Sequence, residues 1–264
     1  MNPAPTTTLT AALTTHGLVV AIGGRTIVSG LDMTLAPGER LTILGRNGAG
    51  KTTLLHTLAG LRAPVAGNIA LCGVSLAHTS ARDVARRRGI LLQQQMDAFP
   101  ATVLETALVG RHPWLDRWAW ESHADAALAR TALAAVGLTG LEPRDVQTLS
   151  GGERQRLAIA TLLTQAPPVA LLDEPLSHLD LNHQMAVLDL FAARAREEST
   201  AVVMVLHDIN LACRHADRAL LLFDDGSHQL GSVAETFNAA TLSRLYGHPL
   251  RCVVVDGQHY FIPE

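Results

Sequence analysis

The chain has 264 residues, 48% of them hydrophobic, and a formal net charge of −3. That length suits one large domain, or one domain with a sizeable insertion, and the apolar fraction is ample for a core. The slightly acidic balance argues against bulk electrostatic binding to nucleic acid, which needs a basic stripe. Three separated cysteines (Cys72, Cys213 and Cys252) without a C-x-x-C pair predict free thiols in a reducing compartment, the cytosol. No stretch approaches the roughly 18 consecutive apolar residues of a membrane span.

In chain order, the threonine-rich residues 1–15 come first and lack the basic start of a signal peptide, so we expect a disordered lead-in. Up to about residue 40, short strand-like runs are broken by GG and PG, which predicts an antiparallel side sheet. Three later runs, at 41–44, 169–173 and 201–207, are apolar throughout, which is typical of strands buried on both faces of a parallel sheet. Helical patterns follow at about residues 51–61, 153–165, 182–197 and 209–216.

The alternation of buried strands with helices predicts an α/β fold, a mostly parallel sheet with flanking helices. Residues 95–150 differ in composition, because they are rich in alanine and leucine and contain all three tryptophans. We interpret them as a helical insertion in a main domain of residues 16–235. Residues 236–264, with turn residues and the run RCVVVDG, predict a small strand-bearing appendix.

The segment GRNGAGKTT, residues 45–53, follows an apolar run and precedes a helical pattern. It satisfies G-x-x-x-x-G-K-[ST], in which bare backbone N–H groups cradle phosphates. We expect Lys51 to reach the β- and γ-phosphates and the Thr52 hydroxyl to ligate magnesium. A flexible glycine loop is the alternative, but the strand before it and the helix after it favour an anion at the helix N-terminus. The residues assigned to this nucleotide site are Gly45, Arg46, Asn47, Gly48, Ala49, Gly50, Lys51, Thr52 and Thr53.

Two further strand ends carry polar side chains suited to phosphoryl transfer. In PPVALLDEP, an apolar strand ends at Asp173, placed to bind the magnesium shell, and Glu174 follows as a candidate to polarise the attacking water. His207 ends the next strand and is a candidate γ-phosphate contact. Because ligands of parallel sheets sit beyond the carboxyl ends of the strands, these residues and residues 45–53 should meet at one edge. The alternatives are a helix-start acid for Glu174 and a structural role for His207.

The stretch LSGGERQRLAIA, residues 149–160, predicts a second phosphate-binding helix N-terminus. Ser150 and Glu153 match a capping box, and Gly151 and Gly152 leave backbone N–H groups bare toward an anion. One γ-phosphate does not need two such cradles from a single chain. A sandwich of two chains, in which each offers its first cradle to one nucleotide and its second to the other, accounts for both.

In this order, GRNGAGKTT, LSGGERQR, LLDEP, SHLD and LHD resemble the ATP-binding subunit of ATP-binding cassette (ABC) transporters over roughly residues 17–235. The resemblance implies a P-loop NTPase core, ATP and Mg²⁺ as cofactors, and a homodimer. It also implies that residues 177–180, with Asp180 at the nucleotide site, cross the dimer interface, and that Gln93 or else Gln94 contacts magnesium. Ile22 stands where the family usually stacks an aromatic side chain on the base, so we expect weaker base discrimination.

The runs FPATVLETALVGRHPWL, HLDLNHQ and VLHDINLACRHAD are similar to import ATPases that serve iron–siderophore, haem and cobalamin uptake. This similarity implies two integral-membrane permease subunits docked on the helical insertion and a periplasmic or surface substrate-binding protein that acts indirectly. It implies a peripheral location on the cytoplasmic face of the inner membrane. Pro113 and the tryptophans Trp114, Trp118 and Trp120 either help to line the permease groove or pack within the insertion. The arginines at 86–88 are expected on a solvated face, with contact to the membrane or the permease as the alternative.

Competing functions differ in architecture. A soluble ABC protein acting on ribosomes usually carries two cassettes, whereas this chain has one P-loop and one LSGG. A DNA-acting member would separate the P-loop from LLDEP by a long coiled coil, and no sustained heptads lie between them. An exporter ATPase subunit is disfavoured by a lone cassette without membrane segments. We therefore expect the ATPase subunit of an importer, whose cargo the sequence alone does not identify.

Overall fold

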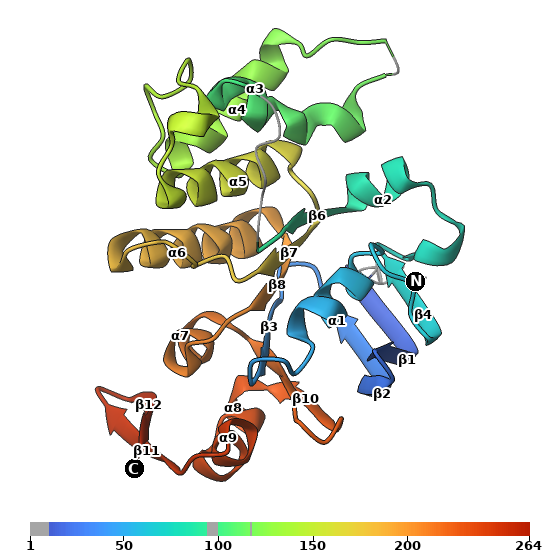
Figure 1. Cartoon of the computed structure of the whole chain (residues 1–264), viewed down its shortest axis with the longest axis vertical. Coiled ribbons are helices and arrows are strands. Elements are labelled where there is room, and N and C mark those ends of the chain that lie inside the picture. Colours follow the sequence, from blue (N-terminus) through green and yellow to red (C-terminus); the bar gives the residue numbers. More distant parts are fainter. Residues whose placement is uncertain (1–10, 94–99, 117) are drawn as a thin grey trace, which may run out of the picture.

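The computed structural model describes residues 11–93, 100–116 and 118–264. Figure 1 shows a central column of strands with a side sheet on one flank, a layer of helices at one end and a small C-terminal unit at the other. The mostly parallel central sheet, the antiparallel side sheet and the inserted helices confirm the predicted fold class. Within the described ranges, no helix has both the length and the apolar character needed to cross a membrane.

The central sheet has six strands in the order β10-β9-β3-β8-β7-β6. Five of them run parallel, and β10 is antiparallel to its neighbour β9. β7 and β8 are buried along their whole length, as their continuous apolar runs predict. β8 ends two residues earlier than expected, so His207 lies beyond the strand. The bounds are β3 Arg40–Gly45, β6 Arg88–Leu91, β7 Val169–Asp173, β8 Ala201–Val205, β9 Arg218–Leu222 and β10 His228–Ser232.

Two apolar cores lie on the two faces of this sheet. On β8, Val203 and Val205 belong to the core beneath the side sheet, while Val202 and Met204 belong to the core beneath the helices. Successive side chains of a strand point to opposite faces, so one apolar run serves both cores.

The side sheet contains four strands in the order β2-β1-β4-β5. It is antiparallel, as predicted, but it reaches past residue 40 because β4 pairs with β1. The expected lead-in of residues 1–15 is too long, because β1 already begins at Leu13, which is fully buried and pairs with Leu35 and Leu71. Residues 1–10 lie outside the described ranges. The bounds are β1 Leu13–Ile22, β2 Arg25–Leu35, β4 Ala66–Leu71 and β5 Val74–Ser75.

Helices cover both faces of the central sheet. Leu54 and Leu58 of α1 (Lys51–Leu58) belong to the core shared with the side sheet. Phe191 of α6 (Leu181–Glu198) and Ala212 of α7 (Ile209–His215) belong to the opposite core. The short helices η1 (Leu76–His78) and α2 (Ala81–Arg87) lead into β6.

The helical layer comprises α3 (Val103–Leu108), η2 (Val109–Trp114), α4 (His123–Ala135), η3 (Val146–Thr148) and α5 (Gly151–Gln165). α5 packs against both α3 and α4, and Leu157 shares a core with Leu133. The layer therefore continues to Gln165, past residue 150, because α5 lies alongside α3 and α4 (Figure 1).

The C-terminal unit comprises α8 (Val233–Thr236), α9 (Ala239–Tyr246), β11 (Leu250–Val255) and β12 (Gln258–Pro263). β11 and β12 form an antiparallel hairpin. The hairpin is fixed to α7, because the backbone N–H of Phe261 donates to Asn210 Oδ1 at 2.8 Å and Asn210 Nδ2 donates to the Phe261 carbonyl at 3.3 Å. The Phe261 ring also packs edge-on against Phe237, with centroids 6.1 Å apart.

Candidate nucleotide-binding site

The P-loop (residues 45–53) connects the end of β3 to the start of α1. Two of its glycines are sterically required. A Cβ on Gly45 would lie 2.7 Å from the Leu222 carbonyl oxygen, and one on Gly50, where φ is +95°, would lie 2.6 Å from Ile27. The loop is thus packed against β9 of the central sheet and β2 of the side sheet, and a side chain at either glycine would disturb this packing.

Lys51 is the only lysine in the sequence and lies inside this loop. It is 6% exposed, and its Nζ donates to the carbonyl oxygens of Gly45 at 2.9 Å and Arg46 at 3.1 Å. Burial lowers the pKa of Lys51, against the opposing effect of the carboxylates of Glu174 and Asp173. A buried ammonium group at a helix N-terminus is well placed for a polyphosphate.

Asp173, at the end of β7, is fully buried beside the start of α1. Its Oδ1 accepts a hydrogen bond from the Thr52 hydroxyl at 3.1 Å, and its Oδ2 has no hydrogen-bond partner within the described ranges. Burial raises the pKa of Asp173, and the Glu174 carboxylate adds to this rise, whereas the Thr52 hydrogen bond and the Lys51 ammonium group oppose it. A buried carboxylate oxygen without a partner, next to a hydroxyl, provides the hard oxygen ligands that suit magnesium.

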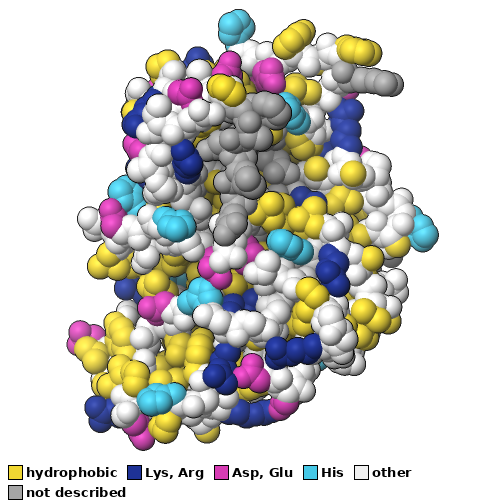
Figure 2. Space-filling model, viewed as in Figure 1, with side chains coloured by type: hydrophobic (Ala, Val, Ile, Leu, Met, Phe, Trp, Pro, Cys, Tyr) yellow, Lys and Arg dark blue, Asp and Glu magenta, His cyan; other side chains and the backbone are white. Residues whose placement is uncertain are grey.

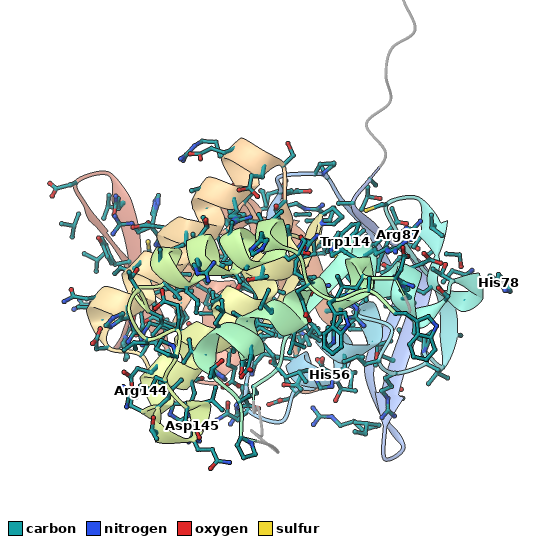
Figure 3. The ribbon with its side chains drawn as sticks, turned by 90° about the horizontal axis from the view of Figure 1, so that it is seen from above. His56, His78, Arg87, Trp114, Arg144 and Asp145 are labelled. Carbon is teal, nitrogen blue, oxygen red and sulfur yellow. The ribbon has the colours of Figure 1, made fainter. Side chains whose placement is uncertain are left out.

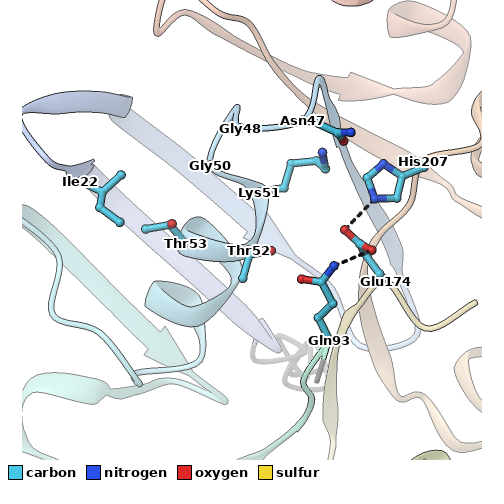
Figure 4. Close-up of a pocket in the computed structure, with 10 residues that line it drawn as sticks. All are labelled: Ile22, Asn47, Gly48, Gly50, Lys51, Thr52, Thr53, Gln93, Glu174 and His207. Carbon is cyan, nitrogen blue, oxygen red and sulfur yellow. Dashed lines mark hydrogen bonds and ion pairs between the residues drawn. The ribbon is translucent and has the colours of Figure 1, made fainter. Parts of the chain in front are cut away.

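Glu174 is held between two strand ends, as Figure 4 shows. Its Oε1 lies 2.6 Å from His207 Nε2, and its Oε2 accepts a hydrogen bond from Gln93 Nε2 at 2.9 Å. Gln93 follows β6 and His207 follows β8, so the predicted meeting of strand ends at one edge is observed. Gln94, the alternative to Gln93, lies outside the described residues.

A cavity of about 750 Å³ opens onto this cluster. Ile22 lies at its far side from His207 (Figure 4) and is 46% exposed, so an aliphatic surface is available to a base. Of the P-loop residues, Gly45, Arg46 and Ala49 do not line this cavity, and the Arg46 guanidinium turns away to pair with Asp224 at 2.8 Å. The lining residues are Ile22, Asn47, Gly48, Gly50, Lys51, Thr52, Thr53, Gln93, Glu174 and His207.

The second cradle is the glycine turn (residues 150–152), which begins α5. The predicted capping box is present: Ser150 Oγ accepts from the Glu153 N–H at 3.3 Å, and the Glu153 carboxylate accepts from the Ser150 N–H at 2.7 Å. Asp180 likewise caps α6 and accepts from the N–H of His183 at 2.9 Å. Neither the glycine turn nor Asp180 lines the cavity of its own chain.

Two polar residues beside the site had no predicted role. His56 lies one helical turn after Thr52, with its Nε2 4.0 Å from Asp173 Oδ2. Helical spacing from Thr52 could have indicated it. Arg25 donates to the Gly48 carbonyl at 3.1 Å, a contact between distant segments that no local pattern predicts.

A glycine loop between a parallel strand and a helix, faced by a buried aspartate, a glutamate and a histidine at neighbouring strand ends, defines a P-loop nucleoside triphosphatase. Comparison with known proteins narrows this class. Residues 28–177 match the family model described as ABC transporter. The chain is 43% identical to the hemin import ATP-binding protein HmuV of Nocardia farcinica, over 95% of this chain and 88% of the relative. It is 37% identical to the ferric enterobactin transport ATP-binding protein FepC of Escherichia coli, over 93% and 90% of the two chains.

Solved structures agree with this result. A metal-chelate type ABC transporter in an inward-facing conformation aligns with a TM-score of 0.83 and 28% identity, over 96% of this chain and 98% of that one. The ATP-binding cassette MJ0796, dimeric and bound to ADP and Pi, aligns with a TM-score of 0.73 and 25% identity, over 84% and 98%. The chain belongs to the ABC transporter family, as one of its ATPases.

Proposed function

We propose that this chain hydrolyses magnesium ATP to drive a membrane importer of iron chelates, haem or a ferric siderophore. The observation that carries the proposal is the Glu174 carboxylate, held by Gln93 and His207 across the cavity from Lys51 and the P-loop. The relatives of this chain that are named for hemin and ferric enterobactin transport support the proposed class of cargo. Cobalamin stays a further candidate on sequence resemblance alone.

In the proposed reaction, the P-loop N–H groups and Lys51 hold the phosphates, and Ile22 covers the base. Glu174 orients and polarises the attacking water, while His207 keeps the carboxylate directed at the γ-phosphate. Thr52, Asp173 and Gln93 would hold magnesium, which when bound neutralises charge on the β- and γ-phosphates. Positioning and charge stabilisation by these side chains account for most of the expected rate gain.

The nucleotide site is complete only with a second copy of the chain. The glycine turn and Asp180 lie outside the cavity of their own chain, although both expose backbone or carboxylate groups suited to a site. A homodimer in which each glycine turn faces the partner's P-loop supplies the missing cradle. The related cassette MJ0796 is dimeric, which supports this arrangement.

The helical layer is the proposed docking site for two permease subunits. Trp114, labelled in Figure 3, is 40% exposed but tied to the layer, because its indole N–H donates to the Gln165 carbonyl at 2.9 Å. The guanidinium groups of Arg86 and Arg111 lie over its ring, 5.6 and 5.5 Å from the ring centroid. Trp118 and Trp120 are 87% and 89% exposed and line a surface cavity at the outer edge of the layer. Figure 2 shows hydrophobic side chains gathered at that edge.

This distribution divides the tryptophans between the two earlier interpretations, because Trp114 contacts the rest of the layer while Trp118 and Trp120 are largely exposed.

The arginines at 86–88 are half-buried and do not form the fully solvated face that was expected. Arg86 donates to the Pro113 carbonyl at 2.8 Å, and Arg88 donates to the Ala59 carbonyl at 2.7 Å. A permease at this face would hold the chain at the cytoplasmic side of the inner membrane, with a substrate-binding protein across it.

The proposal is tested by ATP hydrolysis and by transport. Glu174→Gln should bind magnesium ATP, accumulate as a dimer and lose turnover by about 10²-fold or more, because the general base is gone while both cradles remain. Glu197→Gln, at an exposed glutamate paired with Arg196, is the matched control and should keep wild-type turnover. Unchanged hydrolysis in Glu174→Gln would overturn the assignment.

Transport is measured in proteoliposomes that contain the chain and its permease. Haem and a ferric siderophore are supplied separately on the side opposite the ATPase, and ATP-dependent accumulation is expected for one of them. ATP-dependent movement in the opposite direction would indicate an exporter. ATPase activity stimulated by ribosomes or DNA, with no effect of the permease, would indicate a soluble ABC protein.

A further inference from the structure

Gln155 is a buried glutamine on α5 whose side chain is directed at the segment that carries Glu174. The residue is 9% exposed, and its Nε2 donates a hydrogen bond to the Pro175 carbonyl oxygen at 3.0 Å. It lies one helical turn after the glycine turn that begins α5. The hydrogen bond therefore joins the second phosphate cradle to the residue that directly follows the proposed general base.

Glu174 needs such support because its backbone is strained. Its φ is +49°, in the left-handed region that side chains other than glycine adopt only when their surroundings impose it. The proline after it disfavours the right-handed helical alternative. The Ser177 N–H closes the turn on the Glu174 carbonyl at 3.2 Å, and the bond from Gln155 fixes the next peptide group along the chain.

A second contact joins the same two elements. A Cβ on Gly152 would lie 3.0 Å from the His178 carbonyl oxygen, so the start of α5 lies directly against the loop of residues 174–180. The loop is thus held by α5 at two places, Pro175 and His178. These two contacts give a shift of the glycine turn a direct path to the backbone that carries the Glu174 carboxylate.

We propose that Gln155 is a positioning residue for ATP hydrolysis, which holds Glu174 in its left-handed conformation and couples it to the glycine turn of the same chain. This inference rests on the proposed function. In a dimer, the glycine turn contacts the partner's nucleotide while Glu174 acts on the chain's own. Gln155 therefore makes the geometry of one nucleotide site depend on occupancy of the other.

The test compares Gln155→Met with Gln165→Met in the full-length chain. Both glutamines lie on α5 and donate to backbone carbonyls, but Gln165 bonds Ala85 and Arg88, away from Glu174. We expect Gln155→Met to lower kcat by about tenfold or more, because small displacements of a catalytic group have large effects on rate. KM for ATP and nucleotide binding to the monomer should change less than about twofold. Gln165→Met should leave both constants near wild type.

The decisive measurement repeats Gln155→Met in the Glu174→Gln background, with residual turnover followed by release of labelled phosphate. A residue that acts through the carboxylate adds no further loss there, whereas a general folding defect lowers turnover by the same factor in both backgrounds. The inference would be overturned if Gln155→Met lowered turnover by the same factor in both backgrounds, or if its kcat equalled that of Gln165→Met.

If Gln155→Met does not fold, Gln155→Asn, whose amide is one methylene too short, takes its place with the same expected outcomes. A wild-type chain without ATPase activity would contradict the proposed function itself.

Discussion

The Nε2 atom of His207 lies 2.6 Å from Oε1 of Glu174, while Gln93 donates to the other oxygen of that carboxylate. Glu174 therefore has both oxygens engaged by side chains from the ends of two different strands. This fixes the plane of the carboxylate and directs it toward the cavity beside the P-loop. Removal of either contact should lower the rate of hydrolysis more than it lowers the affinity for nucleotide.

His207→Ala should lower kcat by about 10²-fold, since the carboxylate loses the group that orients it and the γ-phosphate loses a contact. Affinity for ATP should change only a few-fold, because the P-loop is intact. Steady-state ATPase assays and nucleotide binding to the monomer separate the two effects. His78→Ala, at an exposed histidine on η1, is the control and should match wild type. Wild-type turnover in His207→Ala would show that Glu174 does not need this partner.

Lys51→Met should abolish stabilisation of the chain by magnesium ATP. For the wild type, nucleotide at 100 times its Kd should add about 2.7 kcal/mol to the free energy of unfolding. The variant keeps a side chain of similar length but has no ammonium group for the phosphates. Thermal unfolding with and without nucleotide measures the loss.

A second measurement uses the wild type alone. Lys51 is the only lysine, so its acylation, followed by mass spectrometry, should be slowed by magnesium ATP. For the thermal test, the comparison is between the wild type and Lys51→Met. Equal nucleotide stabilisation of both proteins would contradict the site.

Gly50→Ala should destabilise the chain by about 1–3 kcal/mol, since the new Cβ would lie 2.6 Å from the Ile27 side chain and the residue has a φ of +95°. In an Ile27→Ala background, the same substitution should cost less, because the clash is gone and the backbone strain remains. Gly23→Ala, where φ is +56° and nothing lies within 4 Å, measures the strain alone. Urea denaturation gives all the required free energies. An equal cost of Gly50→Ala in both backgrounds would exclude the predicted clash.

His215 should make the stability of the chain fall in mild acid. It is 7% exposed, its Nε2 has no hydrogen-bond partner within the described part of the chain, and burial lowers its pKa. Asp189 opposes this shift, while Arg214 and Arg40 add to it. The unfolded chain therefore takes up a proton near pH 6.5 before the native state does, so this stability is complete above that pH and decreases as the pH falls below it.

His215→Gln should flatten the dependence of the unfolding free energy on pH between about pH 7 and 5. His78→Gln, at an exposed histidine on η1, should leave the slope unchanged. Denaturant titrations at a series of pH values measure both slopes. The same slope in His215→Gln and in the wild type would remove His215 as its source.

The meeting of the P-loop with Asp173 and His207 could be predicted from sequence patterns alone. Lys51 and Thr52 belong to one short motif, and Asp173 and His207 follow apolar runs whose ends must share an edge of a parallel sheet. Their convergence follows from topology, without knowledge of side-chain packing. The antiparallel character of the side sheet was similarly evident from its short runs and turns.

What could not be predicted depends on packing between distant segments. Trp114, Trp118 and Trp120 are close neighbours in the sequence, yet one is tied to Gln165 and the others stay exposed. The predicted limit of the lead-in at residue 15 was wrong because only the partners Leu35 and Leu71 show that Leu13 is core. The bond between Gln155 and Pro175 spans two motifs that sequence patterns treat separately.

The pairing of Asn210 with Phe261 has a practical consequence for anyone handling this protein. Asn210 lies in the first turn of α7, three residues after His207, so the terminal hairpin buttresses the segment that presents the imidazole. An affinity tag fused after Glu264, or a surface that holds this residue, would pull directly on the hairpin that supports Asn210. Attachment through the opposite terminus spares it, and turnover measured in the two formats should differ for that reason alone.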